Sequence, residues 1–406
     1  LTHNRPIHIR TDDSVVRPFR GKEYPVRRAR GYAPEPLRTR ARFARPVLAC
    51  GAELKSTFCL AVGDRAFVSQ HIGDLANAQT LRSFTEGIEH FSRLFGITPA
   101  VIAHDLHPDY LSTGYALDRA AVDPAGPDLV GVQHHHAHIA SCLADNGTDG
   151  PVIGVAFDGT GYGTDGTIWG GEFLIAGLAG FERAGHLTPV PLPGGAAAIR
   201  QPWRMAAAYL DAAYPAGPPG PLDVVRRNER QWAAVTAMAR RGINAPLTSS
   251  AGRLFDAVSA VLGVRDQVNY EGQAAIELEQ LAAPGESGAY PASVDFGDVL
   301  SARGTDLVRA AVADLIAGAS RDVIAARFHN GLAGLIAVCC RELRERTGLS
   351  TVALSGGVFA NLLLLNAVIG LLESAGFTVL THSRVPCNDG GISLGQAVVA
   401  AAGSRG

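Results

Sequence analysis

A run of histidines is the part of this sequence best suited to chemistry, and it lies in the segment 132–140, VQHHHAHIA. His134 and His138 are four residues apart, so on a helix both imidazoles would project from one face. Two imidazoles placed in this way can bind a single metal ion. The alternative is a solvated or partly buried histidine run without ligands. A third ligand would have to come from a distant part of the chain, and an aspartate there would leave positions open for substrate.

Glycine-rich turns follow two predicted buried strands. The sequence DGTGYG at 158–163 follows the strand 152–157, and SGG at 355–357 follows the strand 351–354 and opens a helix. Such turns let backbone N–H groups approach phosphate or ribose oxygens, and a helix N-terminus favours an anion. Neither turn matches the P-loop or the G-x-G-x-x-G pattern, which counts against a P-loop enzyme or a Rossmann dehydrogenase. Ordinary strand–helix turns are the alternative.

Four further side chains carry weaker signals. Lys55 lies at a predicted hairpin with small hydroxyl residues and could hold an anion, although a surface lysine is the simpler interpretation. Asp256 lies in a helical stretch and could accept hydrogen bonds from ribose, or be a solvated surface residue. Asp389 follows a strand and could be a helix N-cap or the missing metal ligand. Cys387 has no evident base partner, so we expect a buried structural thiol.

The composition indicates a soluble globular protein without a nucleic-acid or membrane preference. The 406 residues allow two or more lobes, 47% are hydrophobic and the formal net charge is -2. No uninterrupted apolar run reaches the length of a membrane span, and the polar and basic opening (Thr2, His3, Asn4, Arg5) does not resemble a signal peptide. The chain begins at Leu1 without a methionine, which we interpret as a fragment. The six cysteines form no C-x-x-C pair, so we expect free thiols in the cytoplasm.

Residues 1–45 differ from the rest, with eleven arginines, only four acidic residues and several prolines, so we expect the extended end of another domain and a linker. Beyond them, strands alternate with helices, which predicts an α/β fold. A strand–turn–strand opening occurs at Pro46 and again at Pro151, which suggests two related lobes with a nucleotide cleft between them. Residues 63–64 should form a tight turn, and 180–220 an irregular or inserted segment. The remaining predicted strands are 47–50, 56–62, 66–70, 101–104, 129–132 and 378–382, and the predicted helical regions are 77–94, 224–281, 308–347, 362–375 and 392–401.

Five motifs in order resemble the ASKHA-fold carbamoyltransferases, which are related to the TsaD family: HHHAH, DGTGYG, AGRLFDAV, SGGVFAN and CNDGG. The longer segments VQHHHAHIAS, TSSAGRLFDAVSA and AHDLHPDYLSTGYA are similar to the HypF family of hydrogenase-maturation carbamoyltransferases. TDDSVVR and RRARGYAP resemble the end of the YrdC-like domain of that family. The resemblance implies a two-lobed actin/hexokinase/Hsp70-like fold. Its parts would be a YrdC-like tail at 1–45 and a TsaD-like domain at 46–406, with lobe I at about 46–148 plus 390–406 and lobe II at about 149–389.

Position by position, the resemblance implies a metal centre of His134, His138 and Asp389, with iron or zinc as the divalent metal. It makes Lys55 and Asp158 catalytic, with Asp158 in a phosphate-facing turn near that metal. His135 and His136 match no ligand position. The residues implied to bind the nucleotide are Glu53, Gly159, Thr160, Asp256, Glu271, Gly272, Gly356, Gly357 and Asn361.

The chemistry implied by the resemblance is carbamoyl transfer through carbamoyl-adenylate. In the family, an acylphosphatase-like domain hydrolyses carbamoyl phosphate, and the YrdC-like domain adenylates the carbamate with ATP and Mg²⁺. The part present here would pass the carbamoyl group to the C-terminal cysteine of HypE, for the cyanide ligand of [NiFe]-hydrogenase. The acylphosphatase-like domain, the zinc-binding region and most of the YrdC-like domain are not in this sequence, so we expect only the transfer step.

Four rival functions are weighed against this one. An antibiotic O-carbamoyltransferase of the same fold would use a sugar hydroxyl as acceptor, but there the YrdC-like segment would follow the module. A tRNA threonylcarbamoyl transferase is disfavoured because no basic patch follows the linker. A non-catalytic ATP-binding scaffold would bind ATP without metal or turnover. A hydrolytic metalloprotease is disfavoured by the absence of H-E-x-x-H.

Overall fold

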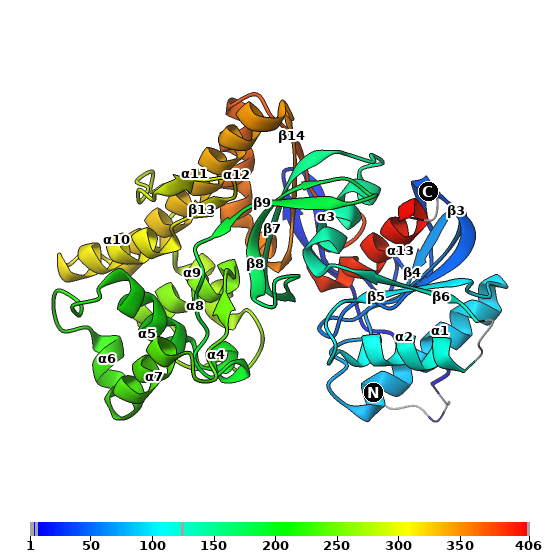
Figure 1. Cartoon of the computed structure of the whole chain (residues 1–406), viewed down its shortest axis with the longest axis horizontal. Helices are drawn as coiled ribbons and strands as arrows, with labels where there is room; N and C mark the ends of the chain where they lie inside the picture. The colour runs from blue at the N-terminus through cyan, green and yellow to red at the C-terminus, as the bar shows by residue number, and fades with distance from the viewer. Residues whose placement is uncertain (1–3, 5–6, 123–125, 404–406) are drawn as a thin grey trace. The chain divides into compact units, whose positions relative to one another are not determined.

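Two compact units make up the computed structural model, which describes residues 4, 7–122 and 126–403 (Figure 1). The first unit contains the chain up to Pro151, the short segment Ala176–Phe181 and the chain from Leu380 onward. The second unit contains Val152–Ile175 and Glu182–Val379. The opening residues Thr2, His3 and Arg5 lie outside the described residues.

The first unit is built on a four-stranded sheet with the order β4-β3-β5-β6. β3 pairs with β4 antiparallel and with β5 parallel, and β5 pairs with β6 parallel. A separate two-stranded hairpin, β1–β2, precedes this sheet. The bounds of the strands are β1 Val15–Phe19, β2 Lys22–Arg27, β3 Leu37–Ala49, β4 Cys59–Val68, β5 Val101–Asp105 and β6 Asp128–Val132.

Helices cover this sheet and bury its apolar side chains. α13 packs on β3, β4 and β5 and also on α3, whereas α2 packs on β5 and β6. α1 begins after Asn77, whose side chain accepts the N–H groups of Gln79 and Thr80, and its residues Phe84 and Phe91 form edge-to-face contacts with Phe58 of the core. The bounds are α1 Ala78–Phe95, α2 Leu111–Ala121, α3 His134–Asp145 and α13 Ile392–Gly403.

The second unit is built on a larger mixed sheet. Its main path among the described residues is β12-β13-β9-β8-β7-β14-β15, and the short strands β10 and β11 join at β8. β14 is parallel to β7, and β13 is parallel to β9. The bounds are β7 Val152–Tyr162, β8 Ile168–Ala176, β9 Phe181–Leu187, β10 Val190–Pro191, β11 Leu247–Thr248, β12 Val294–Phe296, β13 Leu300–Ala302, β14 Thr351–Ser355 and β15 Thr378–Leu380.

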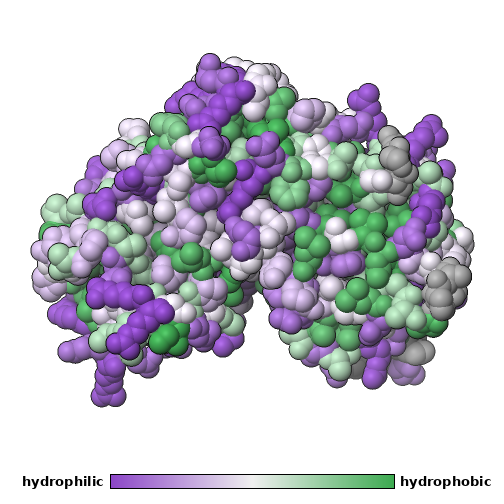
Figure 2. Space-filling model, viewed as in Figure 1, coloured by the Kyte–Doolittle hydropathy of each residue, from purple (hydrophilic) through white to green (hydrophobic). Residues whose placement is uncertain are grey.

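Nine α-helices of the described chain accompany this sheet. α7 is amphipathic, with Val235 and Ala239 buried, and Figure 2 shows hydrophilic side chains over the part of the surface that contains α6 and α7. The bounds are α4 Ala196–Arg200, α5 Pro202–Ala213, α6 Asp223–Arg227, α7 Glu229–Arg241, α8 Ala251–Val261, α9 Gln273–Leu281, α10 Gly304–Ile316, α11 Arg321–Thr347 and α12 Leu362–Ser374.

One described helix, α11, is long and apolar enough by composition to cross a membrane. In the folded protein, 72% of the apolar 18-residue stretch of this helix is buried. The helix lies against α12, α10 and α9, so its apolar surface packs against other parts of the same unit.

The α/β class is confirmed, but two local predictions are wrong. Residues 63–64 form no turn, because β4 runs through them and Gly63 pairs with Phe43 at an irregular step of the ladder. The segment 180–220 is not irregular, because it contains β9, β10, α4 and α5. α5 begins with Pro202 in its first turn and buries Trp203, which gives an alanine-rich segment a place in the core.

Candidate metal centre and nucleotide-binding loops

α3 presents the histidines predicted to bind metal. The side chain of Gln133 caps the helix by accepting the N–H of His136 at 2.9 Å, so the helix begins immediately at His134. The predicted helical spacing is therefore present, and His134 and His138 lie one turn apart with ring centroids 5.0 Å from each other. Both side chains are buried, which excludes the interpretation as a solvated histidine run.

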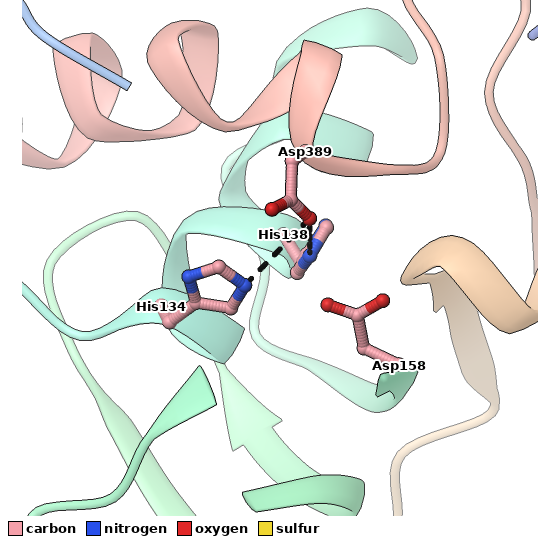
Figure 3. A group of neighbouring side chains, drawn as sticks. All are labelled: His134, His138, Asp158 and Asp389. Carbon is pink, nitrogen blue, oxygen red and sulfur yellow. Dashed lines mark ion pairs between the residues drawn. The ribbon is translucent and has the colours of Figure 1, made fainter. Parts of the chain in front are cut away.

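Asp389 faces both imidazoles (Figure 3). Its Oδ1 lies 3.8 Å from Nε2 of His134 and 3.6 Å from Nε2 of His138, and the three side chains are 11%, 0% and 1% exposed, respectively. Two atoms that bind one ion at about 2.0–2.2 Å can be at most about 4 Å apart, so both distances suit a shared ion. The three residues belong to the first unit.

The donor set fits a divalent metal. Two imidazoles and one carboxylate suit zinc, iron or a similar ion and leave positions open. A bound cation would also balance the charge of the buried carboxylate, because burial of an unpaired charge is costly. The structure therefore brings together the three residues that the resemblance implied as metal ligands, and metal binding by them stays a prediction.

Asp105 orients His134, the first of the predicted ligands, and sequence reasoning missed it. Its Oδ2 lies 2.8 Å from Nδ1 of His134, and both side chains are fully buried. Because a carboxylate only accepts, Nδ1 must carry the proton, which leaves the Nε2 lone pair directed toward Asp389. The order of strands could have pointed to Asp105. This residue ends β5 opposite Val132, just before the histidines, and neighbouring parallel strands end at the same edge of a sheet.

We expect Asp105→Asn to weaken the binding of Zn²⁺ by about 10-fold to 100-fold, because His134 loses its charged partner. The affinity can be measured by competition with a chromogenic chelator. Asp128→Asn on the adjacent strand β6 is the matched control, since Asp128 pairs with Arg45 at the surface. Equal Zn²⁺ affinities in the two variants would contradict an orienting role for Asp105.

The other two histidines of the run make different contacts. His136 Nε2 lies 2.7 Å from the carbonyl oxygen of Gly177, and its ring lies against Phe181. Burial lowers the pKa of His136. His135 Nδ1 lies 3.3 Å from the side-chain amide of Gln133. Neither histidine belongs to the group of ligand atoms around Asp389.

Glu53 and Lys55 lie in the connection between β3 and β4. Glu53 Oε2 accepts the N–H of Leu111 at 2.8 Å and so caps α2, whose own N-cap residue provides no side-chain bond. Burial raises the pKa of Glu53. The backbone N–H of Lys55 donates to Asp74, and Lys55 has a positive φ of 46°. These bonds hold the connection in one conformation; contact of either side chain with phosphate stays a prediction.

Asp158, which Figure 3 also labels, lies on β7 in the second unit. Its Oδ1 accepts the N–H of Gly357 at 2.9 Å, which ties the end of β7 to the turn after β14. Gly356 in that turn has a φ of +101°, and a Cβ there would lie 2.1 Å from the carbonyl oxygen of Phe157. The two glycine-rich segments predicted separately from the sequence are therefore adjacent.

Ser250 fixes the start of α8 against the same loop. Its Oγ lies 3.0 Å from the carbonyl oxygen of Asp158 and 2.6 Å from that of Gly159, and it caps α8 by accepting the N–H of Arg253. Sequence reasoning missed this residue, although a serine before a helical segment is a recognised N-cap signal. A Cβ built on Gly159 would lie 3.9 Å from Glu271 Oε1, so Glu271 borders the loop as well.

Asp256 is buried, so its interpretation as a solvated surface residue is wrong. Its Oδ2 lies 2.7 Å from Nε of Arg253, one turn earlier on α8, and both side chains are 5% exposed. Burial raises the pKa of Asp256 to about 6, against the opposing effect of Arg253. The nearby charge of Glu271 contributes a smaller part of this increase in the pKa. Binding of ribose by Asp256 stays a prediction.

The remaining implied residues have structural partners. Asn361 caps α12 through its Oδ1, which accepts the N–H of Leu364, and its amide nitrogen lies 2.9 Å from Nε2 of His329. Gly272 precedes α9 with a φ of +76°, a conformation that favours glycine. Thr160 lies on β7 after Gly159. The second unit thus gathers the residues around 158–160, 250–256, 271 and 356–357.

The predicted structural role of the cysteines agrees with the structure. All six lie among the described residues, are buried and form no disulfide. Burial raises the pKa of the Cys50 and Cys59 thiols to about 12. A protonated, inaccessible thiol is a poor nucleophile.

Two family models match this chain. "HypF Kae1-like domain" matches residues 42–145, and "Carbamoyltransferase, Kae1-like Domain, second subdomain" matches residues 154–396. Among curated relatives, "Carbamoyltransferase HypF2" of Cupriavidus necator is 42% identical over 98% of this chain and 52% of its own length. A second protein of that organism, "Carbamoyltransferase HypF homolog", is 42% identical over 88% of this chain and 91% of its own length.

Two solved HypF structures share the fold. Full-length HypF in its phosphate- and nucleotide-bound form is 42% identical with a TM-score of 0.92, over 99% of this chain and 62% of the other. HypF of T. kodakarensis is 33% identical with a TM-score of 0.88, and the match covers 98% of this chain and 53% of the other. The chain spans about half the length of most of the curated relatives it matches. From these matches, the chain belongs to the HypF carbamoyltransferase family.

Proposed function

We propose that this chain transfers a carbamoyl group from carbamoyl-adenylate to the C-terminal cysteine thiolate of HypE, for the cyanide ligand of [NiFe]-hydrogenase. Membership of the HypF family supports the reaction class. The observation that carries the proposal is the buried centre of His134, His138 and Asp389, because a non-catalytic scaffold has no need of a metal site with open positions. We further propose that the protein acts in the cytoplasm.

In this proposal the thiolate attacks the carbonyl carbon of the carbamoyl group, a C–S bond forms, and the bond from that carbon to the phosphate oxygen breaks. AMP departs with the electron pair. His134, His138 and Asp389 would hold a metal, which would supply Lewis-acid polarisation of carbamoyl or phosphate oxygens. Lys55 stabilises the negative charge on the departing AMP. An attacking thiolate needs no general base.

The second unit contributes the binding of the adenosine and phosphates in this proposal. Backbone N–H groups of Gly159 and Thr160 and of the 356–357 turn would contact phosphate, with Asp158 as a catalytic side chain of the same loop. Asp256 would hold the ribose, and Glu271, Gly272 and Asn361 would frame the adenosine. Carbamoyl phosphate and ATP with Mg²⁺ are then the precursors from which the relatives' additional domains make carbamoyl-adenylate.

A single-turnover assay tests the transfer step directly. Preformed carbamoyl-adenylate is mixed with the purified chain and a peptide that ends in the HypE C-terminal sequence, and the peptide is analysed by mass spectrometry. We expect the peptide to gain one carbamoyl group as AMP appears, and a peptide with serine in place of the cysteine to gain none. AMP release without peptide modification, or transfer to an aminoglycoside hydroxyl instead, would show that the acceptor is not a HypE-type thiolate.

A further inference from the structure

The C-terminal end of α3 is tied to the segment that carries Asp389. Asp145, the last residue of the helix, accepts through Oδ2 the backbone N–H groups of Ser383 at 2.7 Å and Arg384 at 3.0 Å. The Asp145 side chain is fully buried, so these bonds compensate for the loss of water around its charge. The same helix carries His134 and His138, so a contact with this helix fixes the position of Asp389 relative to the two histidines.

Arg384 completes the connection from the other side. Its Nε donates to Asp145 Oδ1 at 2.8 Å, and its Nη2 donates to the carbonyl oxygens of Ala144 at 3.3 Å and Asp145 at 2.6 Å. These carbonyls belong to the last turn of α3, where a positive charge is favourable. Asn146 adds a bond from its side-chain amide to the carbonyl oxygen of Thr381.

A second anchor lies beyond Asp389. α13 crosses α3 so closely that a Cβ on Gly395 would lie 1.8 Å from the carbonyl oxygen of Ala137. Thr57 Oγ1 also lies 3.0 Å from the carbonyl oxygen of Gly390. The carboxylate ligand therefore sits on a short segment held at Arg384 before it and at Gly395 after it, and both anchors are on the helix that carries His134 and His138.

We propose that Asp145 and Arg384 are positioning residues of the metal centre, which hold the segment 385–391 so that Asp389 faces the two histidines before the metal binds. The inference rests on the metal centre of the proposed function. A segment held by these contacts before the metal binds does not have to be ordered on binding, so its conformational entropy does not oppose metal binding. Loss of either residue releases the Asp389 end of the site and leaves the histidines on α3 in place.

The test measures Zn²⁺ affinity and local order separately. The variants are Arg384→Gln, Arg384→Lys, Asp145→Asn and the double variant Asp145→Asn/Arg384→Gln, with Arg38→Gln as the matched control. Arg38 pairs with Asp64 in the same unit, but at the exposed surface. The Zn²⁺ dissociation constant is obtained by chelator competition, and hydrogen exchange of residues 385–391 is followed in the metal-free protein.

We expect Arg384→Gln and Asp145→Asn each to weaken Zn²⁺ binding by about 10-fold to 100-fold. The double variant should be little worse than the weaker-binding single variant, since both residues act through one contact. Residues 385–391 should exchange faster in these variants, and the control should match the wild type in both measurements. Arg384→Lys keeps the charge but not the branched donor set, so we expect an intermediate loss of Zn²⁺ affinity. This variant also tests the contact if Asp145→Asn does not fold.

The outcomes separate the inference from the proposal on which it rests. If the wild type binds Zn²⁺, His134→Ala abolishes binding, and all Asp145 and Arg384 variants bind like the control, then the positioning role is overturned and the metal centre stands. If the wild type binds neither Zn²⁺ nor Fe²⁺, the metal centre itself is overturned and the positioning role with it.

Discussion

His134→Ala and Asp389→Ala should each reduce the metal content of the purified chain from about one ion to almost none. Each substitution removes one of the three proposed ligand side chains, in which Asp389 Oδ1 lies only 3.6–3.8 Å from the histidine Nε2 atoms. Carbamoyl transfer should fall at least about 100-fold in both variants, since Lewis-acid stabilisation is worth several kcal/mol. Plasma mass spectrometry of protein loaded with Zn²⁺ or Fe²⁺ gives the metal content, and AMP release gives the rate.

His136→Gln is the matched control for this prediction. His136 lies on the same helix but contacts the carbonyl oxygen of Gly177, so its loss should leave the metal content unchanged. Equal loss of metal in all three variants would point to general damage to α3. If the wild type contains no metal after loading, the histidines have a structural role, and the alternative of a non-catalytic ATP-binding scaffold is favoured.

Gly356→Ala should abolish ATP binding and lower the free energy of unfolding by about 2–5 kcal/mol. The new methyl group would lie 2.1–2.9 Å from backbone atoms of Phe157, and the residue has a φ of +101°. Backbone cannot move aside as a flexible side chain does. The turn would therefore shift and break the bond from Gly357 N–H to Asp158. Urea unfolding measures the stability, and calorimetry with ATP and Mg²⁺ measures the binding.

Gly370→Ala provides the control in the neighbouring helix α12. A Cβ at Gly370 would meet no atom within 4 Å, and alanine favours a helix more than glycine does. We expect unchanged ATP affinity and equal or slightly greater stability. ATP binding by Gly356→Ala at the wild-type level would show that the 355–357 turn does not contribute to the nucleotide site.

Most secondary structure followed from local patterns in the sequence. The helix predicted at 77–94 is α1 at Ala78–Phe95, and the strand predicted at 351–354 is β14 at Thr351–Ser355. Such elements depend on hydrophobic periodicity and caps within a few residues of one another. Local reasoning was wrong at Gly63, where pairing with β3 extends the strand through a turn-like sequence. It was also wrong at 180–220, where burial makes alanine-rich segments into core helices.

The candidate site also combines features that the sequence determined with contacts that only the tertiary structure decided. The placement of His134 and His138 on one face of a helix was determined by the sequence, because a four-residue separation fixes their geometry locally. The meeting of α3 with Asp389, the orientation of His134 by Asp105 and the connection of Asp145 to Arg384 were decided only by the tertiary structure. Beyond a single helix or strand, separation along the chain does not predict how far apart two residues lie in the folded protein. The burial of Asp256 against Arg253 depends likewise on what packs around α8. Contacts of this kind arise when helices and strands pack together, and a pattern within one element cannot specify them.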